Sequence, residues 1–144
     1  MDYRSLLSRV YALGSARGID LGLGRMRAAA DALGAPQAAF RSAQVAGTNG
    51  KGAAAVLLER AARAAGLRTG LFTSPHLHRY TERFLVNGAE VSGEDLAPHL
   101  ERALALTGPP HRLALTFFEV TTCAAFSLFQ EKGIELAVLE VGLG

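Results

Sequence analysis

A glycine-rich turn that ends in lysine carries the clearest chemistry in this chain. It lies within residues 45–54, between a short apolar segment and a long alanine-rich run. Glycines let the backbone approach an anion closely and leave its N–H groups unhindered. If the alanine-rich run is a helix, its first amides face the same anion, and the lysine reaches the outer phosphates. The turn therefore predicts a nucleotide site made of seven residues: Gly47, Thr48, Asn49, Gly50, Lys51, Gly52 and Ala53.

The turn departs from the strict P-loop spacing. Val45 stands where that pattern has its first glycine, and Gly52 and Ala53 follow the lysine in place of Ser or Thr. A tight strand-to-helix turn that binds nothing is the alternative. Asn49 and Lys51 inside the turn, with a strand before it and a helix after it, favour phosphate binding over that alternative.

Two oxygen-bearing side chains are expected near the same turn. Glu140 is the one charged residue in the apolar run 137–142, where an ionised carboxylate is unfavourable unless it is paired. Ser74 follows the apolar segment 67–72. Ligands in open α/β sheets lie beyond the carboxyl ends of the strands, so both residues should converge with the turn and could hold Mg²⁺. The alternatives are a salt bridge from Glu140 to a buried Arg or Lys, and an ordinary loop start at Ser74.

Histidines and phenylalanines provide weaker signals. His76 and His78 lie in a loop with no cysteine or third histidine nearby, so solvent-facing histidines are favoured over a transition-metal site, with His76 shaping a substrate site as the other possibility. Phe117 and Phe118 open an apolar helix, where phenylalanines usually belong to the core. Glu119 is explained by a Thr-x-x-Glu capping box at that helix start.

The elements that position these groups alternate between helix and strand. A hairpin is expected around Asn87-Gly88, and the segment 67–72 is expected to be the next parallel strand after the glycine-rich turn. Glycines at 34, 66 and 133 should end the helices before them. Helices are predicted at residues 3–14, 24–33, 53–65, 94–106 and 116–131, and strands at 42–46, 67–72 and 134–141.

Composition indicates a cytoplasmic α/β domain. The chain is 49% hydrophobic and 19% charged, and it has no apolar run near the roughly 18 residues of a membrane span. No secretory signal is visible at the start, and the single cysteine, Cys123, is expected to be a small core residue. The net charge of +2 comes from scattered residues without a basic cluster, so neither nucleic acid nor a membrane is an expected partner.

Six segments together resemble a known family. Gly-Thr-Asn-Gly-Lys at 47–51 resembles the signature of the ATP-dependent amide ligases, which include the Mur ligases and folylpolyglutamate synthase. Five other segments are similar, in order, to those of the folylpolyglutamate and dihydrofolate synthases: residues 18–26, 73–77, 82–84, 117–119 and 140–144. The resemblance implies a P-loop-containing parallel sheet flanked by helices, like the Mur ligase central domain but incomplete. Residues 1–144 would be the N-terminal part of the ATP-binding domain, without its remainder or the C-terminal glutamate ligase domain.

The same resemblance implies an ATP- and magnesium-dependent ligase. It would add L-glutamate to folate or dihydropteroate through an acyl phosphate and would be a monomer at full length. Lys51 is the implied catalytic residue, and Ser74 and Glu140 are the implied Mg²⁺ ligands. The implied substrate contacts are His76, Arg83, Phe117 and Phe118.

One departure and two alternatives accompany this interpretation. Ala53 stands where the family usually has serine, so a hydroxyl near the phosphates is missing. The chain is expected to be too short to catalyse ligation alone. A Mur-type ligase that acts on a nucleotide-sugar substrate is one alternative, although the Ser74-Pro75-His76 segment favours folate. A non-catalytic nucleotide-binding module is the other.

Overall fold

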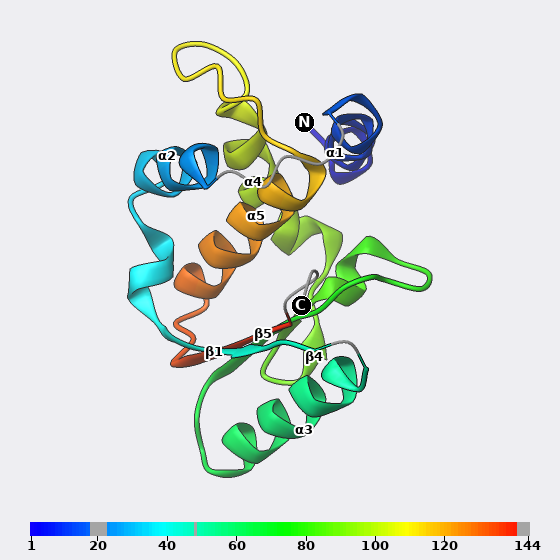
Figure 1. Cartoon of the computed structure of the whole chain (residues 1–144), viewed down its shortest axis with the longest axis vertical. Coiled ribbons are helices and arrows are strands. Elements are labelled where there is room, and N and C mark those ends of the chain that lie inside the picture. The colour runs from blue at the N-terminus through cyan, green and yellow to red at the C-terminus, as the bar shows by residue number, and fades with distance from the viewer. Residues whose placement is uncertain (18–22, 48, 141–144) are drawn as a thin grey trace. The chain divides into compact units, whose positions relative to one another are not determined.

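The computed structural model describes residues 1–17, 23–47 and 49–140, which form two compact units (Figure 1). One unit consists of Met1–Gln37 and Gly93–Leu128, and the other of Ala38–Ser92 and Phe129–Gly144. Three predicted features therefore lie wholly or partly outside the described residues. They are residues 18–22 of the segment 18–26, Thr48, and the glycine-rich end from residue 141.

The first unit is helical. It contains α1 (Tyr3–Arg17), α2 (Gly24–Ala32), α4 (Gly93–Ala105) and most of α5 (Phe117–Glu131). Helices α1 and α4 pack together, and each contributes a buried pair spaced by four residues, Leu6 with Val10 and Leu96 with Leu100. This spacing puts each pair on one face of its helix. No helix in the described part of the chain has the length and apolarity needed to cross a membrane.

Helix α5 begins and ends as the sequence predicts. The Thr116 N–H donates to Glu119 Oε1 at 2.9 Å, and the Glu119 N–H donates to Thr116 Oγ1 at 3.2 Å, which completes the predicted capping box. At the other end, Gly133 has a φ of +66°, a conformation that glycine adopts without strain. Cys123, inside α5, is buried as expected, and burial raises the pKa of its thiol to about 12.

The second unit is built on a sheet of five described strands in the order β1-β5-β2-β3-β4. Strands β1, β5 and β2 are parallel, whereas β3 and β4 are antiparallel additions. The predicted α/β fold is confirmed, but β2 is not the neighbour of β1, because β5 lies between them. The strands are β1 (Arg41–Val45), β2 (Thr69–Phe72), β3 (Phe84–Val86), β4 (Ala89–Glu90) and β5 (Leu136–Glu140).

Helix α3 (Lys51–Ala64) covers one face of the parallel strands (Figure 1). Ala55 of α3, Leu71 of β2 and Val138 of β5 form the core of this face. The Cα hydrogens of Gly70 face the opposite side of the sheet from Leu71, because successive residues of a strand direct their side chains to opposite faces. There Gly70 meets the ring of Phe129, from the last turn of α5. Two short 3₁₀ helices, η1 (Pro36–Ala39) and η2 (Tyr80–Arg83), precede β1 and β3.

The Asn87-Gly88 turn joins β3 and β4 as predicted. Both residues have positive φ, +50° and +81°, as the tight hairpin turn requires. Asn87 Oδ1 also accepts the N–H of Thr69 at 2.9 Å, so the turn secures the start of β2.

Gly70→Ala is expected to destabilise the protein. A Cβ at this position would lie 2.8 to 2.9 Å from ring atoms of Phe129, which is completely buried. Overpacking of this kind typically lowers the free energy of unfolding by about 1–3 kcal/mol. Urea unfolding of the variant and of the wild type measures the difference.

Gly24→Ala is the matched control for this measurement. Neither glycine has a positive φ, and a Cβ at Gly24 meets nothing within 4 Å. Helix propensity predicts an unchanged or higher free energy of unfolding. Wild-type stability in Gly70→Ala would contradict the tight contact with Phe129.

Candidate functional site

The carboxyl ends of β1, β5 and β2 meet at one edge of the sheet. Val45 pairs with Glu140, and the register between β5 and β2 brings Thr73 level with Glu140. The Thr73 N–H donates to the carbonyl oxygen of Arg83 at 3.1 Å. Val45, Glu140, Thr73 and Arg83 therefore form one row across the sheet, which we call the carboxyl edge.

The glycine-rich turn connects this edge to α3. Gly47 has a φ of +146° and Gly50, the N-cap of α3, has a φ of +74°, so both occupy backbone conformations that side chains disfavour. Lys51 is the first residue of the helix and is half-buried, whereas Asn49 and Ala53 are exposed. The turn thus ends at a helix N-terminus, as the sequence predicts.

Glu140 lies against the start of α3. Its side chain is only 7% exposed, and Oε2 would be 3.7 Å from a Cβ placed on Gly52. Among the residues that the structure describes, none forms an ion pair with Glu140, so the salt-bridge alternative has no support there. The turn and the buried carboxylate therefore converge, as expected from their positions at the ends of β1 and β5.

Ser74 follows Thr73 directly and is half-buried. It therefore leaves the sheet at the carboxyl edge, beside the row that contains Glu140. No group of three or more His, Cys, Asp or Glu side chains suited to a metal occurs within residues 1–17, 23–47 and 49–140. The Ser74 hydroxyl and the Glu140 carboxylate are both oxygen donors, the ligand type that hard cations such as Mg²⁺ accept.

His76 is half-buried and bound to Arg83, so it is only partly exposed to solvent, whereas a fully solvent-facing histidine was favoured from the sequence. Arg83 is 8% exposed, and its Nε–H donates to His76 Nδ1 at 2.8 Å. Burial, and then the charge of Arg83, hold the pKa of His76 below its usual value. His78 is exposed, as expected.

Glu82 anchors the loop after Ser74, a role that sequence analysis did not identify. Its carboxylate accepts the N–H groups of Leu77, His78 and Arg79 at 3.1, 3.0 and 2.7 Å. These bonds, with that of Arg79 the largest contribution, hold the pKa of Glu82 below its usual value. The capping signature of Ser or Thr three residues earlier is absent, because Arg79 occupies that position.

The two predicted phenylalanine contacts differ from each other. Both belong to the first unit. Phe117 stacks on Tyr11 with ring centroids 5.5 Å apart and an interplanar angle of 21°, and Phe118 is 44% exposed. Phe117 thus has a packing role within its unit, and Phe118 presents ring surface to solvent.

An ion pair that sequence analysis missed joins α2 to the start of α5. Arg25 donates from Nε and from an Nη atom to the two carboxylate oxygens of Glu119, each at 3.1 Å. Glu119 is therefore both a capping residue and an acceptor for Arg25. The two residues are 94 positions apart, so no local pattern reveals the contact.

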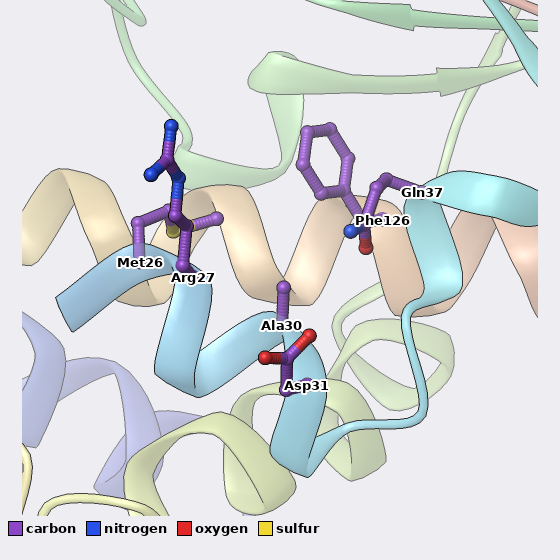
Figure 2. Close-up of a pocket in the computed structure, with 6 residues that line it drawn as sticks. All are labelled: Met26, Arg27, Ala30, Asp31, Gln37 and Phe126. Carbon is purple, nitrogen blue, oxygen red and sulfur yellow. The ribbon is translucent and has the colours of Figure 1, made fainter. Parts of the chain in front are cut away.

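The first unit also contains an open pocket of about 260 Å³ between α2, η1 and α5 (Figure 2). Figure 2 shows the ring of Phe126 and the side chain of Gln37 on one side of it, and residues of α2 on the other. None of the predicted site residues lines this pocket. Its lining residues are Met26, Arg27, Ala30, Asp31, Gln37 and Phe126.

Curated relatives resemble the chain over most of its length. It is 40% identical over 126 residues to the dihydrofolate synthase/folylpolyglutamate synthase of Escherichia coli and 38% identical over 137 residues to that of Bacillus subtilis. Each match covers 88% of this chain but only 29% and 30% of the relatives. The chain belongs to the dihydrofolate synthase/folylpolyglutamate synthase family. No protein-family model matches it.

Solved structures of this family share the fold. Thermotoga maritima folylpolyglutamate synthase matches 99% of this chain with a TM-score of 0.88 and 34% identity. Escherichia coli FolC in complex with DHPP and ADP matches 100% with a TM-score of 0.89 and 38% identity. The chain spans about a third of each neighbour, 33% and 34%.

His76 is expected to titrate below pH 6.5, its ordinary value. A proton on Nδ1 would remove the acceptor for Arg83 and place two cations together. The unfolded chain therefore takes up this proton first, so the stability contributed by neutral His76 is complete above pH 6.5 and is lost as the pH falls through the lower folded-state pKa. Nitrogen-15 NMR of the imidazole ring should show the Nε2–H tautomer and this low midpoint.

The pH dependence of the free energy of unfolding tests the same contact. His76→Asn is the control for it, because asparagine has an acceptor and does not titrate. Its unfolding free energy should depend less on pH below 6.5 than that of the wild type. A His76 midpoint at or above 6.5 would contradict the contact with Arg83.

Proposed function

We propose that this chain provides the ATP-phosphate and magnesium site of a ligase that joins L-glutamate to folate or dihydropteroate. The observation that carries the proposal is the meeting of the glycine-rich turn, at the N-terminus of α3, with the buried carboxylate of Glu140. Membership of the family supports the reaction type, and the E. coli neighbour in complex with ADP supports the nucleotide. The chain would be the N-terminal part of the ATP-binding domain.

The turn and α3 would hold the phosphates. Gly47 and residues 49–53 would bring backbone N–H groups and the positive end of the helix dipole to one place, and Thr48 is proposed with them from the sequence. Lys51, at the first helical position, would neutralise the β- and γ-phosphates. This is positioning and charge neutralisation, which dominate phosphoryl transfer.

Ser74 and Glu140 would hold Mg²⁺. Both lie at the carboxyl edge, and their oxygens belong to the ligand class that this ion prefers. When bound, Mg²⁺ neutralises charge on the phosphate oxygens. Glu140 keeps its carboxylate beside Gly52, close to where the turn would place those phosphates.

The reaction would proceed by carboxylate activation. A substrate carboxylate oxygen attacks the γ-phosphorus of ATP, and ADP leaves. The amine of L-glutamate then attacks the acyl carbon of the resulting acyl phosphate, loses a proton and expels inorganic phosphate. In the sheet unit, Arg83 and His76 are the substrate residues that we propose. In the helical unit, we propose Phe117 and Phe118 from the family resemblance alone, and the exposed ring of Phe118 is suited to stacking on a pteridine.

The relatives named above favour folate over the peptidoglycan-precursor substrate of Mur ligases. Because the chain spans about a third of their length, the complete activity is proposed for the protein at full family length. We propose a monomer in the cytoplasm, where ATP is available. ATP binding without dihydropteroate binding would instead favour the non-catalytic module.

Lys51→Ala is expected to weaken Mg·ATP binding by about tenfold to a hundredfold, because a hydrogen bond to a charged group contributes about 1.5–3 kcal/mol. Isothermal titration calorimetry of the chain measures the dissociation constant. The chain has two lysines, and Lys132→Ala, at an exposed position after α5, is the matched control that should bind like the wild type. If Lys51→Ala binds Mg·ATP as tightly as Lys132→Ala, Lys51 does not contribute to the phosphate site.

Glu140→Gln should leave the fold intact and raise the Mg²⁺ concentration needed for ATP binding, because the amide has the same shape without the charge. Circular dichroism reports the fold, and calorimetry across a magnesium series reports the site. Glu94→Gln, on the exposed start of α4, is the control for loss of one negative charge. An unchanged magnesium dependence in Glu140→Gln would argue against a metal ligand.

A further inference from the structure

The loop after Ser74 leaves the sheet and returns to it at the carboxyl edge. The Thr73 N–H donates to the Arg83 carbonyl oxygen at 3.1 Å, so the two ends of the loop are bound to each other. Ser74, which we propose as a Mg²⁺ ligand, is the first residue inside this closed loop. Residues 77–79 of the loop are exposed, so packing does little to hold them. The position of the Ser74 hydroxyl therefore depends on what else fixes the loop.

The Glu82 carboxylate ties the loop together from inside. Oε2 accepts the N–H of Leu77 at 3.1 Å, and Oε1 accepts the N–H groups of His78 and Arg79 at 3.0 and 2.7 Å. The Glu82 N–H donates in turn to the Arg79 carbonyl oxygen at 3.0 Å. Hydrogen bonds to an ionised acceptor are stronger than those between neutral groups. The backbone of these three residues is therefore bound to the end of the loop.

Residues 74–76 lie between two fixed points of the backbone. The Thr73 N–H is bound at the carboxyl edge, and the Leu77 N–H is bound to Glu82. A segment of three residues that is held at both ends has few conformations, so its first side chain has a defined position. His76 has a side-chain hydrogen bond as well, whereas the bonds to Glu82 hold the backbone itself.

We propose that Glu82 is a positioning residue that holds the Ser74 hydroxyl in place for Mg²⁺. Glu82 acts through the backbone of the loop and does not itself contact the metal. Removal of a group that orients a metal ligand typically lowers metal affinity about tenfold to a hundredfold. That Ser74 is a ligand of Mg²⁺ rests on the proposed function.

Three variants separate this role from the general stability of the loop. Glu82→Ala removes all three backbone bonds. Glu82→Gln keeps one acceptor oxygen, which can retain the two N–H groups that Oε1 accepts. Glu90→Ala is the matched control, because Glu90 binds the same loop through the side chains of Arg79 and Thr81. The exposed fractions of the two glutamate side chains are similar, 22% for Glu82 and 30% for Glu90.

The first measurement is nitrogen-15 NMR relaxation of the Ser74 backbone N–H in the chain without ligand. An order parameter of about 0.85 indicates a rigid backbone, and one below about 0.6 a flexible backbone. We expect a rigid Ser74 in the wild type and in Glu90→Ala, a flexible one in Glu82→Ala, and an intermediate value in Glu82→Gln. A rigid Ser74 in Glu82→Ala would overturn the proposal, and so would an equal loss of order in Glu90→Ala.

Circular dichroism reports whether each variant folds. If Glu82→Ala does not fold, Glu82→Asp takes its place in both measurements. Aspartate keeps the charge, but its side chain is one methylene shorter and draws the carboxylate away from the three N–H groups. A rigid Ser74 in this variant would overturn the proposal in the same way.

The second measurement is calorimetric titration of the chain with ATP across a magnesium series. Glu82→Ala should raise the Mg²⁺ concentration needed for ATP binding about tenfold to a hundredfold, as expected for a group that orients a metal ligand, and Glu90→Ala should behave like the wild type. In the Ser74→Ala background, Glu82→Ala should have no further effect. Additive losses in the double variant would overturn the proposal, because Glu82 would then act without Ser74.

The two measurements distinguish failure of this proposal from failure of the proposed function. If the wild type binds no ATP, or if Ser74→Ala leaves the magnesium dependence unchanged, the proposed phosphate and metal site is wrong. The order parameters then decide alone whether Glu82 fixes the position of Ser74. If Ser74→Ala weakens the magnesium dependence and Glu82→Ala does not, Ser74 remains a ligand and Glu82 does not position it.

Discussion

The site depends on the position of β5 between β1 and β2. This strand is the last described element of the chain, yet it pairs with both of the others, from Arg41 with Leu136 on one side to Phe72 with Leu139 on the other. Parallel strands cannot be joined by a tight turn, so their register is set by packing of residues far apart in sequence. Ala137 and Val138 of β5 are completely buried, and their burial fixes the register. Only when β5 is in place do the turn after β1, the loop after β2 and Glu140 share one edge.

This register also explains how a carboxylate can lie almost buried at the end of an apolar strand. Glu140 is close to Gly52 in the first turn of α3, where the helix dipole is positive and partly offsets the desolvation of the anion. A phosphate at the same helix terminus would bring a second anion to that place. The Mg²⁺ that we propose at Ser74 and Glu140 would relieve this repulsion, together with the positive charge of Lys51 at the start of α3.

Local signals in the sequence predicted the local structure. The glycine-rich turn, the Thr116–Glu119 capping box and the Asn87-Gly88 hairpin each depend on residues within a few positions of one another, where backbone sterics and side-chain reach decide the outcome. The contacts that were missed depend on tertiary packing. The insertion of β5 follows from strand pairing between residues far apart in the chain, such as Arg41 with Leu136 and Thr69 with Leu136, and the Arg25–Glu119 ion pair joins residues 94 positions apart. The contact of His76 with Arg83 was not predicted, because nothing in the local sequence of a loop shows that its histidine accepts a hydrogen bond from a buried arginine seven residues later.

Alanine at position 53, where the family resemblance leads one to expect serine, takes little from the phosphate site that we propose. The first hydrogen bond of α3 runs from the Ala54 N–H to the Gly50 carbonyl at 3.0 Å, so the N–H groups of the three preceding residues lie outside the ladder of the helix. Those donors belong to the backbone and do not change when serine is replaced by alanine. What alanine removes is one hydroxyl in the exposed first turn of the helix. The anion binding that we propose for the turn would therefore rest on its glycine conformations and on Lys51, both of which the chain has.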